Sequence, residues 1–302
     1  MQKIKLHKKG PKLSKLIYGA WRLSEDKNST DTDVIIKKIK TCLDIGITSF
    51  DHSDIYGDYS CEEIFGNAIQ KDKSISKKIE IISKCGIMLL SNKKIQTRLK
   101  HYDSSIHHII TSTEESLKKL HVEKIDLLLL HRPDPISNPE EIAKAFEKLG
   151  ASGKVLHFGV SNYLPHQFET LQKYVGFPLC TNQIEINPLR VTPFLDGSLD
   201  QCLQYKIKPL AWSPFAGGRI FTDNDERTVA VRNVLQKIAE REKTNLESVI
   251  LKWLTFSPHG ILPIIGTNRT ERILALKDFE SIQLDRQDWF EIYSASRGRE
   301  VE

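Results

Sequence analysis

Short apolar runs alternate with longer segments of helical periodicity along almost the whole chain. Eight such runs are rich in β-branched residues and are bounded by turn or helix-capping residues, which is typical of buried strands. They lie at residues 16–20, 48–51, 80–84, 125–131, 156–161, 180–184, 208–212 and 261–265. Eight strands that alternate with helices favour a closed parallel (β/α)8 TIM barrel, with an open doubly wound sheet as the structural alternative.

The segments between these runs carry an apolar residue every three or four positions, as amphipathic helices do. They lie at residues 33–43, 62–69, 108–120, 139–149, 166–174, 198–205 and 226–242. Two more elements flank the predicted barrel. Residues 3–7 and 12–16 predict a β-hairpin that closes the N-terminal face of the barrel, and residues 287–295, capped by Asp285, predict an additional C-terminal helix.

The length of 302 residues suits a single α/β barrel, because such barrels commonly fold as one unit at this size. No stretch rich in Pro, Gly or Ser interrupts the chain, so we expect one domain over residues 1–302. A Rossmann domain would carry a GxGxxG motif after an early strand, and residues 17–24 contain none. The open sheet is therefore disfavoured.

Composition argues against several classes of function. The formal net charge is +5, but the lysines are mixed with acidic residues along the predicted helices, so no nucleic-acid partner is expected. No long apolar run marks a signal peptide or a membrane span, and we expect a cytoplasmic protein. The five cysteines form no CxxC pair and are expected to be reduced thiols. Since no coiled-coil heptads are present, a monomer is the default expectation.

Polar residues stand at the ends of several predicted strands, where barrels of this kind carry their chemistry. Asp51 ends the run ITSFD, Lys84 ends IEIISK and His131 ends IDLLLLH, while Tyr56 follows Asp51 in the loop DHSDIY. Taken singly, each has an ordinary structural explanation, such as a helix cap, a solvated lysine, a buried histidine or a packed tyrosine. Together, three ionisable strand-end residues beside a tyrosine indicate a catalytic site.

This set of residues suits carbonyl reduction, which needs a proton donor for the substrate oxygen. Lys84 is expected to lower the pKa of Tyr56, and Asp51 to hold Lys84 in place and charged. His131 is then expected to orient the substrate oxygen. A metal site is disfavoured, because Asp51 and His52 are consecutive in a strand and point to opposite faces. A nucleophilic hydrolase would need a GxSxG motif, which is absent.

These residues and their surroundings resemble the aldo/keto reductase family, from YGAW at residues 18–21 to IIGT at residues 264–267. The contexts FDHSDIYG, ISKCG and DLLLLHRPD match the catalytic motifs of the family. The runs HRPDP, GVSNY and AWSPFAGGR are most similar to a bacterial oxidoreductase subgroup. The resemblance implies a (β/α)8 barrel that transfers a hydride between a nicotinamide cofactor and a carbonyl or alcohol. It also implies the catalytic tetrad Tyr56, Asp51, Lys84 and His131.

The resemblance further implies which residues bind the cofactor. Ser161, Asn162 and Gln183 would hydrogen-bond the nicotinamide carboxamide, and Trp212 would stack on the ring. The two glycines of the next loop would let backbone N–H groups approach the pyrophosphate, with a mere flexible turn as the alternative. The predicted cofactor-binding residues are Gly19, Ala20, Asp51, Ser161, Asn162, Gln183, Trp212, Ser213, Pro214, Gly217, Gly218, Arg219, Ile265, Gly266, Thr267, Asn268 and Arg272.

The choice between the two nicotinamide dinucleotides depends on the segment after the last strand. Arg272 aligns with the family's arginine for the adenosine 2′-phosphate, and Thr267 aligns with a hydroxyl that shares this phosphate. The N-terminus of the following helix is expected to favour phosphate. Many members carry a lysine where this chain has Gly266, so NADP(H) is preferred and NAD(H) is less favoured. Alternatively, Arg269 and Arg272 are ordinary surface residues of a first helical turn.

A small carbonyl or alcohol substrate is expected to lie against Trp21, Tyr56, His131 and Tyr102. Residues 86–105 are long and polar for a barrel connection, which predicts a mobile loop that sets specificity. The sequence thus predicts a metal-free, NADP(H)-dependent oxidoreductase with Tyr56 as the general acid or base. The alternative function is a cofactor-binding, redox-sensing regulatory subunit with little turnover, because a fold alone does not determine activity.

Overall fold

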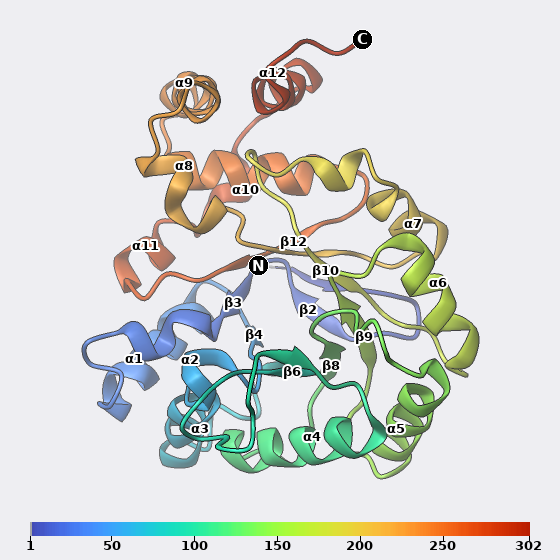
Figure 1. The fold of residues 1–302 in the computed structure, drawn as a ribbon. Coiled ribbons are helices and arrows are strands. Elements are labelled where there is room, and N and C mark those ends of the chain that lie inside the picture. Colours follow the sequence, from blue (N-terminus) through green and yellow to red (C-terminus); the bar gives the residue numbers. More distant parts are fainter. Residues whose placement is uncertain (1) are drawn as a thin grey trace.

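Eight strands close into a parallel barrel in the computed structural model, which describes residues 2–302. Each strand pairs with the next one along the chain, and the last strand pairs back with the first (Figure 1). The barrel strands are β3 (Ile17–Gly19), β4 (Ser49–Asp51), β5 (Glu80–Cys85), β8 (Leu127–Leu130), β9 (Phe158–Ser161), β10 (Asn182–Glu185), β11 (Leu210–Trp212) and β12 (Leu262–Ile265). The predicted (β/α)8 barrel is confirmed, and the open sheet is wrong.

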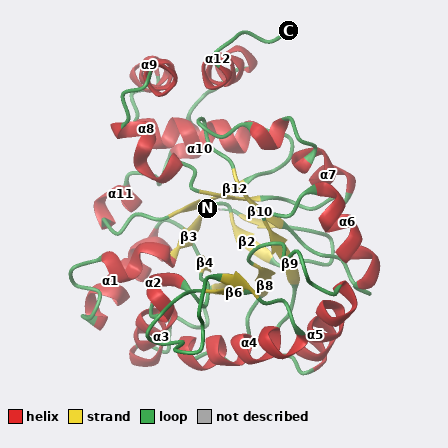
Figure 2. Ribbon diagram, in the orientation of Figure 1, coloured by secondary structure: helices red, strands yellow, loops and turns green. Residues whose placement is uncertain are grey.

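Helices surround the barrel as a ring (Figure 2). The helices of the predicted segments are α1 (Thr32–Asp44), α3 (Cys61–Lys71), α4 (Ile106–Leu120), α5 (Pro139–Ala151), α6 (Pro165–Tyr174), α7 (Ser198–Gln204) and α9 (Glu226–Arg241). Side chains cap several of them: Asp31 accepts from Asp33 N at α1, and Asn138 accepts from Glu140 N at α5. Such caps satisfy backbone donors that have no partner inside the helix.

The sequence prediction missed α10 (Leu246–Phe256) entirely. This helix lies between the barrel and α9, and its buried residues include Val249, Trp253 and Leu254. A helix that is apolar on most sides shows little of the periodicity by which helices are recognised in a sequence. Two shorter helices were also missed, namely α2 (Tyr56–Tyr59) and α8 (Arg219–Thr222), whereas α11 (Thr270–Leu274) is the helix expected after the last strand.

Both predicted flanking elements are present. Strands β1 (Lys3–Lys5) and β2 (Lys12–Ser14) pair as an antiparallel hairpin. Leu13 of β2 and Leu6, which directly follows β1, are fully buried in one cluster with barrel residues such as Ile17, Leu127 and Leu210. Burial of these leucines against side chains of the barrel strands means that the hairpin closes one end of the barrel.

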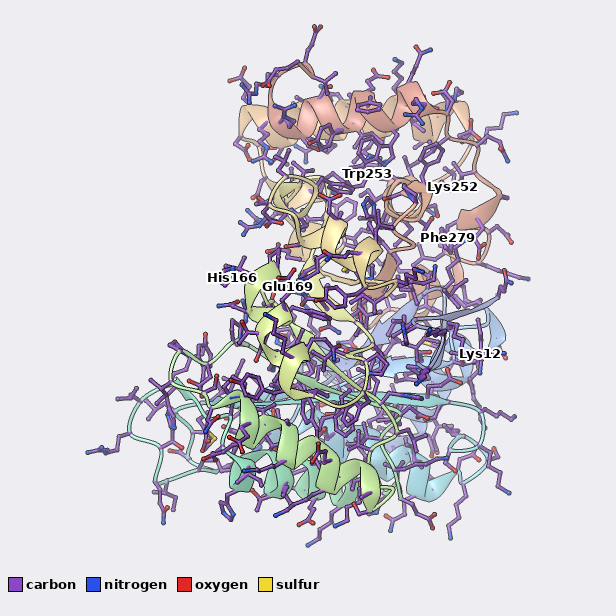
Figure 3. The ribbon with its side chains drawn as sticks, turned by 90° about the vertical axis from the view of Figure 1, so that its right-hand side faces the viewer. Lys12, His166, Glu169, Lys252, Trp253 and Phe279 are labelled. Carbon is purple, nitrogen blue, oxygen red and sulfur yellow. The ribbon has the colours of Figure 1, made fainter. Side chains whose placement is uncertain are left out.

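The C-terminal helix α12 (Arg286–Arg297) begins at Asp285, whose side chain accepts from Asp288 N. It packs outside α10 through two tryptophans whose rings stack, with centroids 5.5 Å apart. The indole N–H of Trp253 donates to the backbone oxygen of Trp289 at 3.1 Å, and that of Trp289 donates to Trp253 O at 3.2 Å. Figure 3 shows Trp253 beneath this outermost layer. Both indole donors are therefore satisfied although the rings are packed.

The segment 86–105 contains a short antiparallel pair, β6 (Ile87–Met88) with β7 (His101–Tyr102). The Leu89 amide donates to the Tyr59 hydroxyl at 2.9 Å, which ties this segment to α2. All five cysteines are buried and free, as expected. Within residues 2–302, no helix has both the length and the apolar character needed to cross a bilayer.

Candidate active site

Lys84 lies at the centre of the four residues that the strand-end pattern singled out. Its Nζ donates to Asp51 Oδ2 at 2.8 Å, to the Tyr56 hydroxyl oxygen at 2.9 Å and to His52 O at 2.7 Å. An ammonium group has three hydrogens, so all of its donors have acceptors. The pairing of β4 with β5 aligns Asp51 with Ile82, two residues before Lys84, which brings the two side chains together.

The Tyr56 hydroxyl accepts the Lys84 hydrogen bond, so its own hydrogen is directed elsewhere. Burial raises the pKa of Tyr56 well above 10, and the nearby Asp51 carboxylate raises it further. The sequence-based prediction of a lowered Tyr56 pKa is therefore wrong for this structure, because desolvation and the Asp51 charge dominate. The consequence is a neutral phenol whose O–H hydrogen can be donated.

Burial lowers the pKa of Lys84, and the adjacent Asp51 carboxylate opposes this effect. Asp51 is itself held from a second side, because Gln183 Nε2 donates to Asp51 Oδ1 at 2.8 Å. Lys84 is 1% exposed and Asp51 2% exposed, so the ion pair between them is desolvated. A desolvated ion pair needs such additional hydrogen bonds to offset the loss of water.

His131 directly follows β8, and its ring lies nearly perpendicular to that of Tyr56, with centroids 5.9 Å apart. Burial lowers the pKa of His131 well below 6.5, and the positive charges of Lys84 and Arg132 lower it further. The imidazole is therefore neutral near pH 7. Its Nδ1 lies 3.0 Å from the hydroxyl oxygen of Ser53, and Asn162 Nδ2 donates to the His131 backbone oxygen at 3.2 Å.

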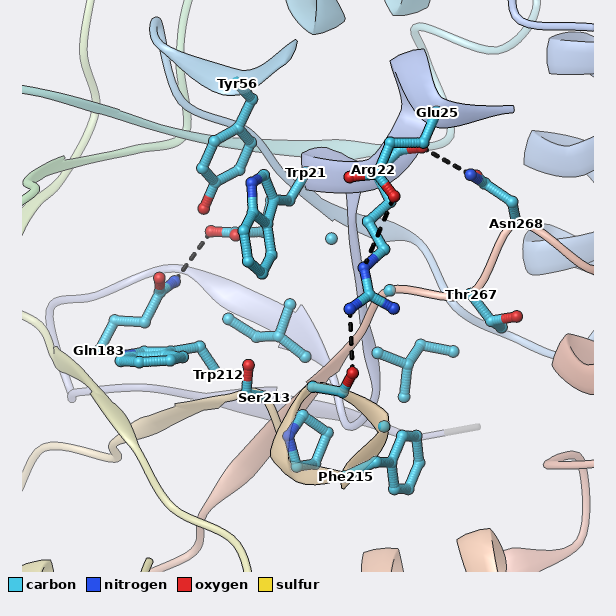
Figure 4. Close-up of a pocket in the computed structure, with 18 of the residues that line it drawn as sticks. Trp21, Arg22, Glu25, Tyr56, Gln183, Trp212, Ser213, Phe215, Thr267 and Asn268 are labelled. Carbon is cyan, nitrogen blue, oxygen red and sulfur yellow. Dashed lines mark hydrogen bonds and ion pairs between the residues drawn. The ribbon is translucent and has the colours of Figure 1, made fainter. Parts of the chain in front are cut away.

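A cavity of about 470 Å³ opens above these residues (Figure 4). Most of the predicted site residues border it: Gly19, Trp21, Asp51, Tyr56, His131, Ser161, Asn162, Gln183, Trp212, Ser213, Pro214, Gly217, Gly218, Ile265, Gly266, Thr267, Asn268 and Arg272. Lys84 lies behind Tyr56 and does not line the cavity. The cavity therefore joins the strand-end residues to the segment that follows β12.

Besides Lys84, three predicted residues do not border this cavity. Ala20 is fully buried in the hydrophobic core, because the chain turns into the 3-10 helix η1 (Ala20–Glu25) directly after β3. Arg219 turns back on its own loop, where its Nε donates to Ala216 O at 3.3 Å. Tyr102 lies in the β6–β7 pair. The structure thus does not bring these residues to the others.

Several cavity residues were not predicted, among them Arg22 and Arg132. Arg22 extends from η1 across the cavity, and its Nη2 donates to the backbone oxygen of Gly217 at 3.0 Å (Figure 4). Arg132 has its guanidinium 5.9 Å from the centre of the Trp212 ring. Each arginine directly follows a predicted site residue, Trp21 or His131, and this adjacency was the only signal in the sequence. The remaining lining residues are Glu25, Phe215, Phe221, Ile264 and Arg269.

Asn162 joins the two halves of the cavity wall. Its Oδ1 accepts the indole N–H of Trp212 at 3.0 Å, and its Nδ2 also donates to Ser161 Oγ at 2.8 Å. The backbone at Asn162 has a φ of 61°, a left-handed conformation that asparagine tolerates better than most residues. These bonds fix the plane of the Trp212 ring beside His131.

Beyond β12 the chain forms a loop before α11, and this helix has only five residues. The phosphate site that the sequence suggested at the N-terminus of this helix stays a prediction. The Asn268 side chain is used inside the protein: it donates to Arg22 O at 2.6 Å and accepts from Lys38 Nζ at 2.9 Å. Arg272 lines the cavity, and within residues 2–302 no carboxylate pairs with it.

His52 points away from the cavity and packs its ring against Phe65, with centroids 4.5 Å apart, as the strand alternation predicted. Among residues 2–302, no group of three or more His, Cys, Asp and Glu side chains is arranged to hold a metal ion.

A buried carboxyl group, that of Glu62 in α3, lies behind the cavity wall. Its Oε1 accepts from Ser83 Oγ at 2.6 Å, and within the described chain its Oε2 has no hydrogen-bond partner. Burial raises the pKa of Glu62 to about 7, and the Ser83 hydrogen bond opposes the rise. Glu62 is thus a titrating group close to Lys84 that does not touch the cavity.

The sequence and the fold of this protein are similar to those of known oxidoreductases. The sequence profile described as the aldo/keto reductase family matches residues 15–297. Over the full length of both chains, the protein is 43% identical to the uncharacterized oxidoreductase YcsN of Bacillus subtilis. It is 40% identical to the 6-dehydroglucose reductase of Agrobacterium fabrum, again with 100% of both chains covered. The glycerol dehydrogenase of Gluconobacter oxydans has the same fold, with a TM-score of 0.85 at 22% identity over 99% of this chain and 97% of that one.

We expect Glu62→Gln to change how the stability of the protein depends on pH. The pKa of Glu62 in the folded state, about 7, exceeds its ordinary value of 4.5, so folding favours the protonated form. The contribution of Glu62 to the free energy of unfolding is therefore fully present below pH 4.5. It falls by about 3 kcal/mol as the pH rises through 7. Urea unfolding of both proteins at pH 5 and pH 8 measures this loss. A stability difference between them that does not change with pH would contradict the assignment.

Proposed function

Because this chain belongs to the aldo/keto reductase family of oxidoreductases, we propose that it reduces an aldehyde or ketone with NADP(H), or oxidises the corresponding alcohol. The observation that carries the proposal is the hydrogen bond from Lys84 to Tyr56, whose phenol borders the cavity. Residues 1–302 would act as one domain, because β12 pairs with β3 and so joins the two ends of the chain. Enzymes of this family use nicotinamide cofactors.

Tyr56 is the general acid in the proposed reduction. A nicotinamide held beside Trp212, Ser161 and Gln183 would supply the hydride for the carbonyl carbon. As the substrate oxygen gains negative charge, Tyr56 transfers its hydroxyl proton to that oxygen. The charge left on the Tyr56 oxygen is stabilised by Lys84, which already donates to it at 2.9 Å. Asp51 keeps Lys84 charged and in position, and His131 orients the substrate oxygen.

The groups that line the cavity fit a nicotinamide dinucleotide. One end carries the flat face of Trp212 with the polar side chains of Ser161 and Gln183, and the Gln183 amide oxygen accepts no hydrogen bond within residues 2–302. In the middle, a Cβ added at Gly217 or Gly218 would meet no atom within 4 Å, so the backbone of this loop is open to a ligand. These are the donor and acceptor types that a carboxamide and a pyrophosphate require.

Preference for NADP(H) is proposed from Arg272. Its guanidinium lines the cavity and pairs with no carboxylate in the described chain, whereas Arg269 is paired with Glu271 at 2.9 Å. A guanidinium without a partner suits a phosphate dianion, which accepts two parallel hydrogen bonds. Thr267 adds a hydroxyl at the same end of the cavity.

Arg272→Ala should weaken binding of NADPH by about 10- to 100-fold, because a hydrogen bond to a charged group contributes roughly 1.5–3 kcal/mol. Binding of NADH, which lacks the 2′-phosphate, should hardly change and serves as the internal control. Titration of tryptophan fluorescence with each dinucleotide measures both affinities. Equal weakening for both would place Arg272 elsewhere than at the 2′-phosphate.

The substrate class is proposed to be a hydroxylated aldehyde derived from a sugar. The Agrobacterium fabrum relative is named for 6-dehydroglucose. Here Arg132 stands beside His131 at the cavity wall with no ion pair or hydrogen bond to the rest of the described chain. A guanidinium offers five N–H donors and no acceptor, so it suits a substrate that presents several oxygen atoms. Trp21, 54% exposed at the same cavity, adds an apolar face.

Arg132→Ala is expected to raise the KM for a sugar-derived aldehyde by at least about tenfold, through the loss of hydrogen bonds from a charged donor. The KM for propanal, which has no hydroxyl group, should stay the same. Steady-state kinetics with both aldehydes and both proteins separates the two effects. A similar change for the two substrates would show that Arg132 acts on the site as a whole and would count against the proposed class.

Tyr56→Phe tests the central assignment. The variant lacks the donated proton, so kcat for reduction should fall at least about 100-fold, while NADPH affinity is unchanged. Turnover is followed by the loss of reduced cofactor, and affinity by tryptophan fluorescence. Undiminished turnover in the variant would remove Tyr56 from the chemistry. If the wild-type protein binds the cofactor but turns over no carbonyl compound, a redox-sensing regulatory subunit is favoured instead.

A further inference from the structure

The Ser53 hydroxyl connects His131 to a buried carboxyl group that the proposed mechanism does not use. Ser53 Oγ lies 3.0 Å from His131 Nδ1 and 3.0 Å from Asp54 Oδ1. The other carboxyl oxygen, Asp54 Oδ2, accepts from the Ser112 hydroxyl at 2.8 Å. Ser53 is fully buried and Asp54 is 7% exposed, so this chain of groups lies inside the protein. It ends at the ring of His131, which borders the cavity.

A hydroxyl group carries a single hydrogen, which limits how the hydrogens can be distributed among Asp54, Ser53 and His131. Ser53 Oγ also lies 3.3 Å from Lys84 O, which is farther than the 3.0 Å to Asp54 Oδ1. If Asp54 is ionised, it can only accept, so the Ser53 hydroxyl donates to this nearer, charged oxygen and His131 donates from Nδ1 to Ser53. The neutral imidazole then has no hydrogen on Nε2. If Asp54 is protonated, it donates to Ser53, and Ser53 donates to Nδ1. The hydrogen of the neutral ring is then on Nε2.

We propose that Ser53 and Asp54 are positioning residues that set the tautomer of His131 and thereby decide whether its Nε2 is a donor or an acceptor toward the cavity. The change between the two states conserves every proton. The Asp54 proton moves to Ser53, the Ser53 proton moves to Nδ1, and the Nε2 proton leaves to water in the cavity. His131 Nε2 makes no hydrogen bond within residues 2–302 and is not a buried atom. Since His131 borders the cavity, Nε2 is open to this space.

The tautomer matters because a carbonyl oxygen can only accept hydrogen bonds. This consequence rests on the proposed carbonyl reduction. With Asp54 protonated, His131 Nε2–H can donate to the substrate carbonyl. With Asp54 ionised, the Nε2 lone pair faces the carbonyl oxygen and repels it. Reduction should therefore require the proton on Asp54. Burial raises the pKa of Asp54, which favours the protonated form, and the Ser112 hydrogen bond opposes this rise.

Other titratable or charged groups lie close to Asp54 and His131, and their titration must be distinguished from that of Asp54. Those close to Asp54 come from α2, α3, β5 and α4, and are Tyr56, Tyr59, Glu62, Lys84, Cys85 and His108. Those close to His131 are Lys84, Lys100 and Arg132. Glu62 is the closest rival, because it is also a buried carboxyl group, but its hydrogen bond runs to Ser83 and does not reach His131. Glu62→Gln is therefore the matched control for Asp54→Asn.

The direct test is the tautomer of His131 in the cofactor-free protein. ¹⁵N-histidine NMR distinguishes a ring nitrogen that carries hydrogen from one that does not, and the His131 signals are identified by their loss in His131→Gln. We expect hydrogen on Nε2 at low pH and on Nδ1 at high pH in the wild type and in Glu62→Gln. The switch should be absent in Asp54→Asn and in Ser53→Ala. One tautomer in the wild type over the whole pH range in which the protein stays folded, or a switch that persists in Asp54→Asn, would overturn the proposal.

The kinetic test is the pH profile of kcat/KM for reduction, measured together with the thermal stability of each variant. The wild type and Glu62→Gln should lose up to tenfold in kcat/KM for each pH unit above the transition that NMR reports. This decline should be absent in Asp54→Asn, and Ser53→Thr, which keeps the hydroxyl, should restore it relative to Ser53→Ala. A tautomer switch in a protein that reduces no carbonyl would refute the proposed function but would leave the proposed role of Ser53 and Asp54 in setting the His131 tautomer intact. A decline retained in Asp54→Asn would refute the link between this tautomer and the rate.

Discussion

The buried ammonium group of Lys84 is the constraint on which the site depends. A positive charge that is 1% exposed is costly unless every one of its donors is satisfied. Its three acceptors come from one short stretch of the chain, residues 51–56, and are the side chain at the end of β4, the next backbone carbonyl and the first residue of α2. The three hydrogen bonds of Lys84 therefore fix the path of the chain after β4 and the position of the Tyr56 ring at the cavity.

Around this compensated ion pair, burial keeps the other groups of the site uncharged. The pKa of Tyr56 is raised and that of His131 is lowered, so near pH 7 both present neutral hydrogen-bonding groups to the cavity. For neutral groups, the positions of individual hydrogens decide what they can bind. At His131, Ser53 contacts the ring from behind the cavity wall, and Asn162 within the wall holds the backbone oxygen.

The barrel, the three ionisable strand-end residues and the nearby Tyr56 could be predicted because they follow from local patterns. Apolar runs of strand length alternate with helical segments, and a polar residue at the end of an apolar run must lie at the barrel rim. The rest depends on geometry that local patterns do not encode. Ala20 was expected at the cavity, but the turn into η1 buries it, and α10 is too uniformly apolar to show a helical period. The Tyr56 pKa was predicted in the wrong direction because the sequence reveals Lys84 as a neighbour but not the extent of desolvation.

The hydrogen bond from Arg22 to the backbone oxygen of Gly217 turns an open groove into a ring of protein. The side chain that closes the ring comes from the segment after β3, and its acceptor comes from the loop after β11. An elongated molecule lying along the cavity beneath this bridge would be encircled, so it could leave only by sliding lengthwise or by breaking the bond. Its residence time would then depend on the opening rate of a single arginine contact, and so would be partly independent of how tightly the molecule is held at either end.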